Sequence, residues 1–157
     1  MKKYLKTFIL ASIIGFFLGF VCIKQYKDTS TIKVSNSVNT LYFVQYGVFS
    51  SKENMEENTI NLQNYIYNIN EDLYYVYVGI CKNRDNAEKI SMYFNDLGYS
   101  TIIKEYDVNN KEFIKEIIKL DDILINTEDN IAIGSIANQS LEKYESIVNG
   151  SRNKENT

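Results

Sequence analysis

The sequence has no histidine, no proline, no tryptophan and only two cysteines among its 157 residues. Without histidine, Ser-His-Asp and Cys-His catalysis lack a required member, and metal sites built from histidine or several cysteines are excluded. Cys22 lies in an apolar run near the N-terminus and Cys81 stands alone beyond it, so no cysteine pair is left for a disulfide in the later part of the chain. We therefore expect no catalytic residues, no metal and no cofactor.

Positive charge is also scarce, because 17 lysines and arginines stand against 20 aspartates and glutamates, for a formal net charge of -3. Nucleic-acid binding depends on basic side chains that neutralise phosphates, so we expect no nucleic-acid partner. Tyrosine, in contrast, is abundant, with 13 residues. A chain of this length that is 45% hydrophobic can form one modest domain with a real core.

The first long apolar run is residues 7–23, which contain no charged side chain and follow a basic tail at residues 1–6. This pattern predicts a single-pass membrane anchor with a cytoplasmic N-terminus and an extracytoplasmic domain. A cleaved signal peptide begins in a similar way, but no small-residue cleavage site follows the run. Residues 28–40 are polar and without periodicity, as is typical of a linker.

An internal repeat at an offset of 32 residues, from Val44 to Val76, organises the middle of the chain. It aligns residues 44–49 with residues 76–81, two short apolar stretches that each carry glycine at the fourth place. The match continues downstream, where residues 52–56 fall over residues 84–88. Each unit has the pattern of a strand, a loop and a helix.

Apolar stretches predict four strands, at roughly residues 41–49, 67–70, 73–81 and 99–106. Ser50 with Glu53 has the spacing of a capping box at the start of the first helix, and Asn83 is placed to cap the second, which Gly98 ends. The order β-α-β-β-α-β predicts an α+β split β-α-β sandwich at residues 41–106. In this fold both helices lie on one face of a four-stranded antiparallel sheet, and the other face is open.

Period-two alternation assigns the strand side chains to these faces. The side chains expected under the helices are Val44, Tyr46, Val48, Val76, Val78 and Ile80. Those expected on the open face are Gln45, Gly47, Phe49, Tyr75, Tyr77 and Gly79. Glycine allows close approach, tyrosine offers a flat amphipathic surface, and the glutamine amide both donates and accepts hydrogen bonds. The open face therefore has the composition of a docking surface.

The stretches Val44-Gln45-Tyr46-Gly47-Val48-Phe49-Ser50 and Val76-Tyr77-Val78-Gly79-Ile80 resemble the two strand motifs of SPOR domains. A membrane anchor followed by a linker and such a domain also resembles the usual layout of the family. The resemblance implies an extracytoplasmic, non-catalytic module that binds peptidoglycan glycan strands stripped of their stem peptides, in bacterial division or sporulation proteins. It further implies a glycan site formed by Gln45, Gly47, Phe49, Ser50, Tyr75, Tyr77 and Gly79.

The sequence departs from the family on the third strand, where many members carry arginine or a large aromatic residue and this chain has Tyr75 and Tyr77. Loss of arginine weakens an ion pair to the lactyl carboxylate of muramic acid, unless Lys82, Arg84 or Lys104 substitutes for it.

Residues 110–148 show two amphipathic stretches that predict two further helices, followed by a polar tail at residues 149–157. These helices have to bury their apolar faces on the open sheet face, on a sheet edge, on each other or on another protein. The last possibility gives an alternative function, a protein-interaction module of the division or sporulation machinery that binds no sugar. Adjacent acidic pairs such as Glu56-Glu57 and Asp121-Asp122 are typical of a solvated helix face rather than of a glycosidase.

Overall fold

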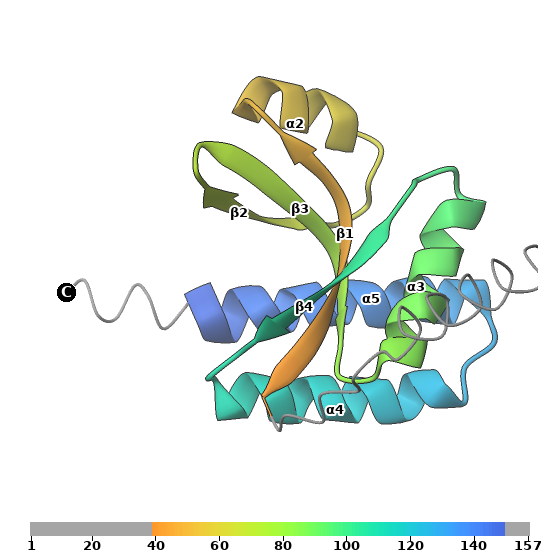
Figure 1. Ribbon diagram of the computed structural model, residues 1–157. Coiled ribbons are helices and arrows are strands. Elements are labelled where there is room, and N and C mark those ends of the chain that lie inside the picture. The colour runs from red at the N-terminus through yellow and green to blue at the C-terminus, as the bar shows by residue number, and fades with distance from the viewer. Residues whose placement is uncertain (1–38, 150–157) are drawn as a thin grey trace, which may run out of the picture. The chain divides into compact units, whose positions relative to one another are not determined.

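The computed structural model describes residues 39–149, whose elements follow the predicted order of strands and helices (Figure 1). The elements are β1 (Thr40–Phe49), α2 (Lys52–Thr59), β2 (Ile66–Asn70), β3 (Leu73–Cys81), α3 (Arg84–Asp96), β4 (Ile102–Asp107), α4 (Lys111–Ile125), α5 (Asn130–Tyr144) and a short π-helical segment, η1 (Glu145–Asn149). The predicted basic tail (1–6) and anchor (7–23), and nearly all of the linker (28–40) and polar tail (149–157), lie outside the described residues. Within residues 39–149, no helix combines the length and the hydrophobicity needed to cross a membrane.

The sheet contains four antiparallel strands in the order β2-β3-β1-β4. This arrangement is consistent with the predicted split β-α-β fold. The hairpin between β2 and β3 turns at Glu71 and Asp72, which both have positive φ, at 49° and 61°. Two consecutive left-handed residues are the signature of the type I′ turn that matches strand twist.

The helix ends follow local side-chain signals. Asn83 caps α3 as predicted, and Gly98 follows α3 with a φ of 90°. The predicted cap at Ser50 is wrong by one residue, since the hydroxyl of Ser51 accepts a hydrogen bond from the Asn54 N–H at 3.2 Å. Ser51 is also the residue that the 32-residue offset aligns with Asn83. The repeat therefore extends to the caps of both helices.

Two bulges interrupt the pairing of β1 with β3. Val44 opposes Gly79 but Gln45 opposes Tyr77, so Val78 is the extra residue on β3. Gly47 then opposes Val76, so Tyr46 is the extra residue on β1. Side chains along a strand alternate between the two faces of the sheet. Each extra residue therefore places the side chains that follow it on the face opposite to the one that strict alternation predicts.

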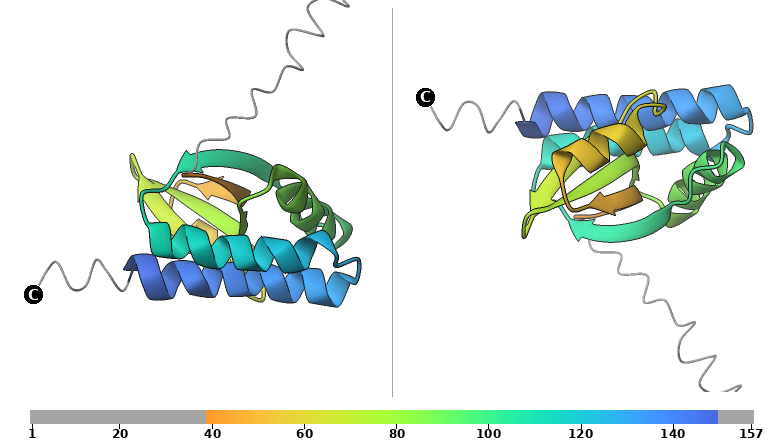
Figure 2. Two further views of the ribbon diagram at one scale, coloured as in Figure 1. Left: turned by 90° about the horizontal axis from the view of Figure 1, so that it is seen from below. Right: turned by 90° about the horizontal axis from the view of Figure 1, so that it is seen from above.

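The C-terminal helices α4 and α5 pack against each other and against β3, and both views of Figure 2 show them side by side, with α3 next to them. Strand β2 pairs with β3 only as far as Tyr77, which leaves the edge of β3 without a strand beyond that point. Helix α5 covers this edge, and the Ser140 hydroxyl accepts the Ile80 N–H at 2.9 Å. The predicted C-terminal helices thus become part of the sheet's own core.

All side chains from Thr40 to Gln45 are buried. Since successive side chains of a strand point to opposite faces, both faces of the sheet are covered along this half of β1. The prediction that helices occupy one face and leave the other open is therefore wrong for this half. The reason is the C-terminal pair of helices, which adds fully buried side chains to the core: Phe113, Ile117, Leu124 and Leu141.

A carboxylate joins α4 to the end of β3. Asp121 accepts hydrogen bonds from the backbone N–H groups of Lys82, at 2.8 Å, and Asn83. Burial raises the pKa of Asp121 above its ordinary value, in spite of these hydrogen bonds. Beside it, Cys81 is free and buried, and burial raises the pKa of its thiol.

Candidate functional site

Three of the predicted glycan-binding residues are buried. Gln45 is 4% exposed and Tyr77 is 3% exposed, and Gly79 is buried as well. A Cβ atom on Gly79 would lie 3.0 Å from Ile90 of α3 and 3.6 Å from Ala137 of α5. Gly79 therefore serves helix packing, whereas the sequence predicted that it lies on an open surface.

The bulges separate the other predicted residues. Gln45, Tyr77 and the half-buried Tyr75 share one face, because Gln45 opposes Tyr77 and side chains two apart on a strand point the same way. Phe49 opposes Tyr74 and so lies on the other face. Gly47 lies with Phe49, and a Cβ atom on it would be 2.7 Å from the Phe49 ring. Ser50 is exposed before α2. The seven predicted residues do not form one surface.

The side chain of Gln45 has unused hydrogen-bonding capacity. Its Oε1 atom is buried and has no hydrogen-bond partner among the described residues. An unpaired buried acceptor costs about 1–3 kcal/mol. Gln45 therefore lowers the stability of the sheet.

A cleft of about 350 Å³ opens on the face of Gln45 and Tyr77, between the strands and the C-terminal helices. It is lined by Phe43, Asn68, Tyr106, Asp107, Val108, Asn109, Asn110 and Tyr144. These residues come from β1, β2, β4, the loop after β4, and α5. The cleft thus depends on α5 for one of its walls.

Aromatic rings in edge-to-face contact form the floor of the cleft. The Phe43 ring centroid lies 5.3 Å from that of Tyr77, 5.2 Å from Tyr106 and 6.1 Å from Tyr144. The Tyr77 and Tyr106 hydroxyls are 2.8 Å apart, and the Tyr144 hydroxyl donates to Asn68 Oδ1 at 3.4 Å. Burial, followed by the hydrogen bond to Tyr106, raises the pKa of Tyr77, so the hydroxyl stays neutral. The floor is therefore aromatic, and it rests on the neutral Tyr77 side chain beneath it.

The rim of the cleft is polar. The Asp107 carboxylate accepts a hydrogen bond from the Thr40 hydroxyl at 2.8 Å, and Asn110 caps α4 by accepting from the Phe113 N–H at 3.0 Å. Asn109 is exposed. An apolar floor with a rim of amides and one carboxylate has the general composition of a small-ligand site.

Only one of the three cations predicted to replace the family's arginine lies on this face. Lys104 is exposed and directly opposes Phe43 on β4, so the two side chains share a face. Lys82 donates to the Thr40 carbonyl at 2.8 Å. Arg84 forms ion pairs with two glutamates, Glu88 and Glu105. Of these three cations, Lys104 is therefore the one that shares a face of the sheet with Phe43, a residue that lines the cleft.

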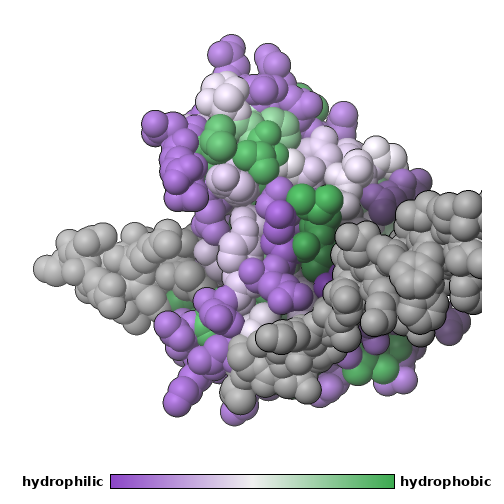
Figure 3. Space-filling view, in the orientation of Figure 1, coloured by the Kyte–Doolittle hydropathy of each residue, from purple (hydrophilic) through white to green (hydrophobic). Residues whose placement is uncertain are grey.

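Elsewhere, apolar side chains reach the surface near the ends of the strands. Figure 3 shows one apolar patch over the upper ends of β1 and β3 and a second beside β4, with polar residues between them. Val48 on β1 is 42% exposed and Ile102 on β4 is 51% exposed. This part of the sheet remains open to solvent, in contrast to the half that contains Thr40 to Gln45.

The comparisons with known proteins find one similar structure. No family model matches the chain, and no curated protein matches it. The solution structure of the peptidoglycan-binding domain of the B. subtilis cell wall lytic enzyme CwlC is similar at 26% sequence identity and a TM-score of 0.39. The match covers 48% of this chain and 98% of that domain.

Proposed function

We propose that this protein is a membrane-anchored, extracytoplasmic and non-catalytic binder of peptidoglycan, which recognises denuded glycan strands at septal or sporulation sites. Three features support the proposal: the repeated strand motif that resembles SPOR domains, the β-α-β-β-α-β order, and an aromatic cleft on the face of the sheet that carries Gln45. The cleft is the observation on which the proposal depends most, because it has exposed aromatic and amide side chains on the face where Gln45 and Tyr77 are buried.

The chemistry of the cleft suits a sugar chain. Exposed tyrosine and phenylalanine rings pack against the apolar faces of sugar rings, and Tyr106 is 39% exposed at this site. The amides of Asn68 and Asn109 are placed to bond acetamido and hydroxyl groups. Its volume lies at the lower end of the roughly 300–1,000 Å³ typical of small-ligand sites, so contact with one or two sugar units is expected. Lys104 is the proposed partner of a lactyl carboxylate.

Retention on purified cell walls tests this function. The chain from Ser37 onward should be retained by sacculi treated with an amidase, which removes the stem peptides, and less by untreated sacculi. The double variant Tyr106→Ala/Asn68→Ala should lose most of this retention. The matched control, Tyr67→Ala/Asn70→Ala, changes a similarly exposed tyrosine and an asparagine outside the cleft and should be retained like the wild type. Equal retention of both double variants would reject the cleft.

The proposed anchor and orientation have a separate test. Alkaline phosphatase fused to the C-terminus should be active in cells, and the chain should stay in the membrane fraction after an alkaline carbonate wash. An inactive fusion, or release by carbonate, would contradict the proposed localisation without affecting glycan binding.

The alternative, a protein-interaction module of the division or sporulation machinery, has one observation in its favour. The C-terminal helices expose isoleucines, with Ile123 57% and Ile131 82% exposed. Deletion of residues 110–157 cannot test this, because it would remove core side chains such as Phe113 and Leu141. The double variant Ile123→Lys/Ile131→Lys keeps the core. Loss of septal localisation with unchanged sacculus retention would favour a protein partner.

A further inference from the structure

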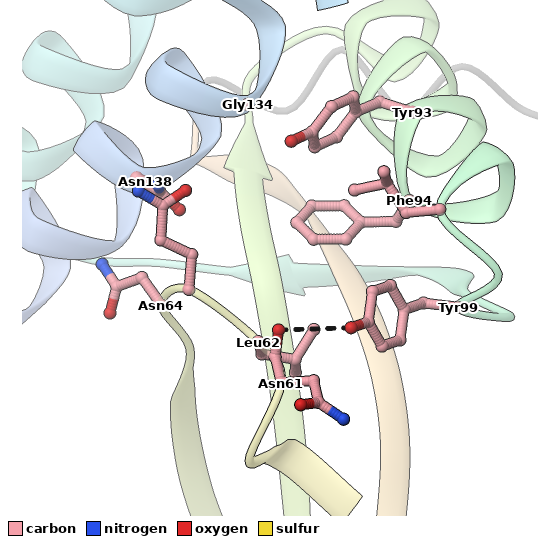
Figure 4. Close-up of a pocket in the computed structure, with 10 residues that line it drawn as sticks. Asn61, Leu62, Asn64, Tyr93, Phe94, Tyr99, Gly134 and Asn138 are labelled. Atoms are coloured by element: carbon pink, nitrogen blue, oxygen red, sulfur yellow. Dashed lines mark hydrogen bonds between the residues drawn. The ribbon is translucent and has the colours of Figure 1, made fainter. Parts of the chain in front are cut away.

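A second cavity, separate from the cleft, lies between α3, α5 and the loop that follows α2 (Figure 4). Its volume is about 260 Å³, and it shares no lining residue with the cleft. None of the ten residues that line it is charged. A buried cation or anion would find no counter-charge there, so the cavity favours an uncharged ligand.

The cavity has an aromatic wall and an amide wall. Figure 4 shows Tyr93, Phe94 and Tyr99 on one side and Asn64 and Asn138 on the other. The Phe94 ring centroid lies 5.0 Å from that of Tyr93 and 6.3 Å from that of Tyr99. The Tyr99 hydroxyl donates to the Asn61 carbonyl at 3.2 Å, which holds the loop after α2 against the aromatic wall. The walls are thus fixed by contacts that do not use the amides of Asn64 and Asn138.

These two amides are available to a ligand. Among residues 39–149, neither the Asn64 nor the Asn138 side chain has a hydrogen-bond partner, and both are partly buried. An amide offers two donors and an acceptor. A ligand that exchanges hydrogen bonds with both amides while it packs on an aromatic surface needs polar groups on one edge and an apolar face on another.

A glycine keeps this cavity open. Gly134 lies inside α5, in the second turn, where glycine destabilises a helix relative to alanine. A Cβ atom there would lie 2.5 Å from the Tyr93 hydroxyl oxygen. Gly134 and Asn138 are four residues apart and so share one face of α5. A side chain at position 134 would therefore displace the Tyr93 ring from its place in the cavity wall.

We propose that this cavity is a second sugar site, which binds one neutral N-acetylated hexosamine unit through the Asn64 and Asn138 amides and the Tyr93, Phe94 and Tyr99 rings. The acetamido group both donates and accepts hydrogen bonds, the ring carries apolar faces, and the unit has no charge. The inference rests on the proposed function for the source of the sugar, whereas the choice of a neutral ligand rests on the cavity alone. Two sites on one domain would also raise the avidity for a continuous strand.

Titration of the full-length chain, in detergent micelles, with tri-N-acetylchitotriose tests the proposal. In NMR spectra of the ¹⁵N-labelled protein, we expect saturable shifts of the Asn64 and Asn138 side-chain amides and of the Gly134 N–H. N-acetylmuramic acid, which carries a carboxylate, should produce shifts only at concentrations at least tenfold higher. No saturable shift, or shifts confined to the cleft, would overturn the proposal.

Two variants and one control complete the test. Gly134→Ala should weaken chitotriose binding at least tenfold, and Asn138→Ala, which leaves the helix and Tyr93 undisturbed, should weaken it several-fold. The control Tyr67→Ala/Asn70→Ala, which lies outside both the cavity and the cleft, should bind chitotriose like the wild type. Unchanged binding by Asn138→Ala would contradict the proposal. If chitotriose binds here while denuded sacculi do not retain the protein, the proposed function fails and this site stands.

Discussion

The two repeat units of the sheet differ in how much of each the rest of the protein covers. The first, β1 with α2, has a helix of eight residues, and its glycine, Gly47, meets only the ring of Phe49. The second, β3 with α3, has a helix of 13 residues, and its glycine, Gly79, is packed under α3 and α5. The same motif therefore specifies topology in both units, whereas the C-terminal helices decide which unit is accessible.

Because of this difference, the candidate site lies away from the motif residues that the sequence predicted. In the second unit, the motif residues Tyr77 and Gly79 are buried in the core. The accessible aromatic surface lies instead where Tyr106 and Tyr144 meet Phe43 in the first half of β1. The added helices close one part of the face and create a cleft at its border.

The largest effect is expected from Asp121→Ala, which removes the link between α4 and the second unit. The variant leaves the Lys82 and Asn83 N–H groups without their acceptor. Each unsatisfied donor costs about 1–3 kcal/mol, so the free energy of unfolding should fall by about 3 kcal/mol in urea denaturation. The matched control is Asp122→Ala, at an exposed neighbouring position, with an expected change below about 0.5 kcal/mol. Equal losses of unfolding free energy in the two variants would show that the Asp121 hydrogen bonds do not stabilise the contact between α4 and the second unit.

A smaller effect is expected from exchanging the two motif glycines. Gly79→Val should lower the free energy of unfolding by about 2 kcal/mol, because its side chain overpacks against Ile90 and Ala137. Gly47→Val should change it by less than about 1 kcal/mol, since the partly exposed Phe49 ring can move away. Thermal denaturation of both variants measures the difference. Similar losses of unfolding free energy in the two variants would contradict the claim that the glycine of the second unit is more closely packed than that of the first.

The next prediction concerns glycan binding and compares two substitutions of an aromatic residue by alanine. Tyr106→Ala should weaken binding to denuded glycan about tenfold, equivalent to about 1.4 kcal/mol, because a ring of the cleft floor is lost. Phe49→Ala, in the exposed first unit, should leave the affinity unchanged. Sedimentation with amidase-treated sacculi over a range of protein concentrations measures both. A greater loss from Phe49→Ala would place the site at the solvent-exposed end of β1 instead.

The smallest effect concerns the cap of the first helix. Ser51→Ala should lower the free energy of unfolding by about 0.5–1 kcal/mol, since α2 loses its N-cap hydrogen bond. Ser50→Ala should have no measurable effect. If Ser50→Ala is the more costly change, the capping-box interpretation from the sequence is correct and the offset between Ser51 and Asn83 has no structural meaning.

The topology could be predicted from the sequence because its signals are local. The Asn83 cap, the turn at Glu71 and Asp72 and the end of α3 at Gly98 each depend on a few neighbouring residues. The bulges could not be predicted, because Val78 and Tyr46 are ordinary strand residues that do not mark a bulge. Each bulge moved half of a strand to the other face, which is why the predicted face mixed accessible and buried positions.

The cleft could not be predicted for a different reason. Asn68, Tyr106 and Tyr144 come from three elements that are distant in sequence, and no spacing links them. They meet because β2 is short and leaves an edge of β3 to α5, a consequence of tertiary packing. The abundance of tyrosine was the one signal in the sequence that pointed toward an aromatic surface, without its location.

The most direct test of this account is a map of backbone amide shifts in the ¹⁵N-labelled protein with soluble glycan fragments from amidase-treated sacculi. The account predicts the largest changes at Asn68 and at residues 106–110, with little change at residues 47–50. The largest changes at residues 47–50 and at Tyr74 and Tyr75, or no saturable change at all, would contradict the claim that the C-terminal helices form the binding cleft.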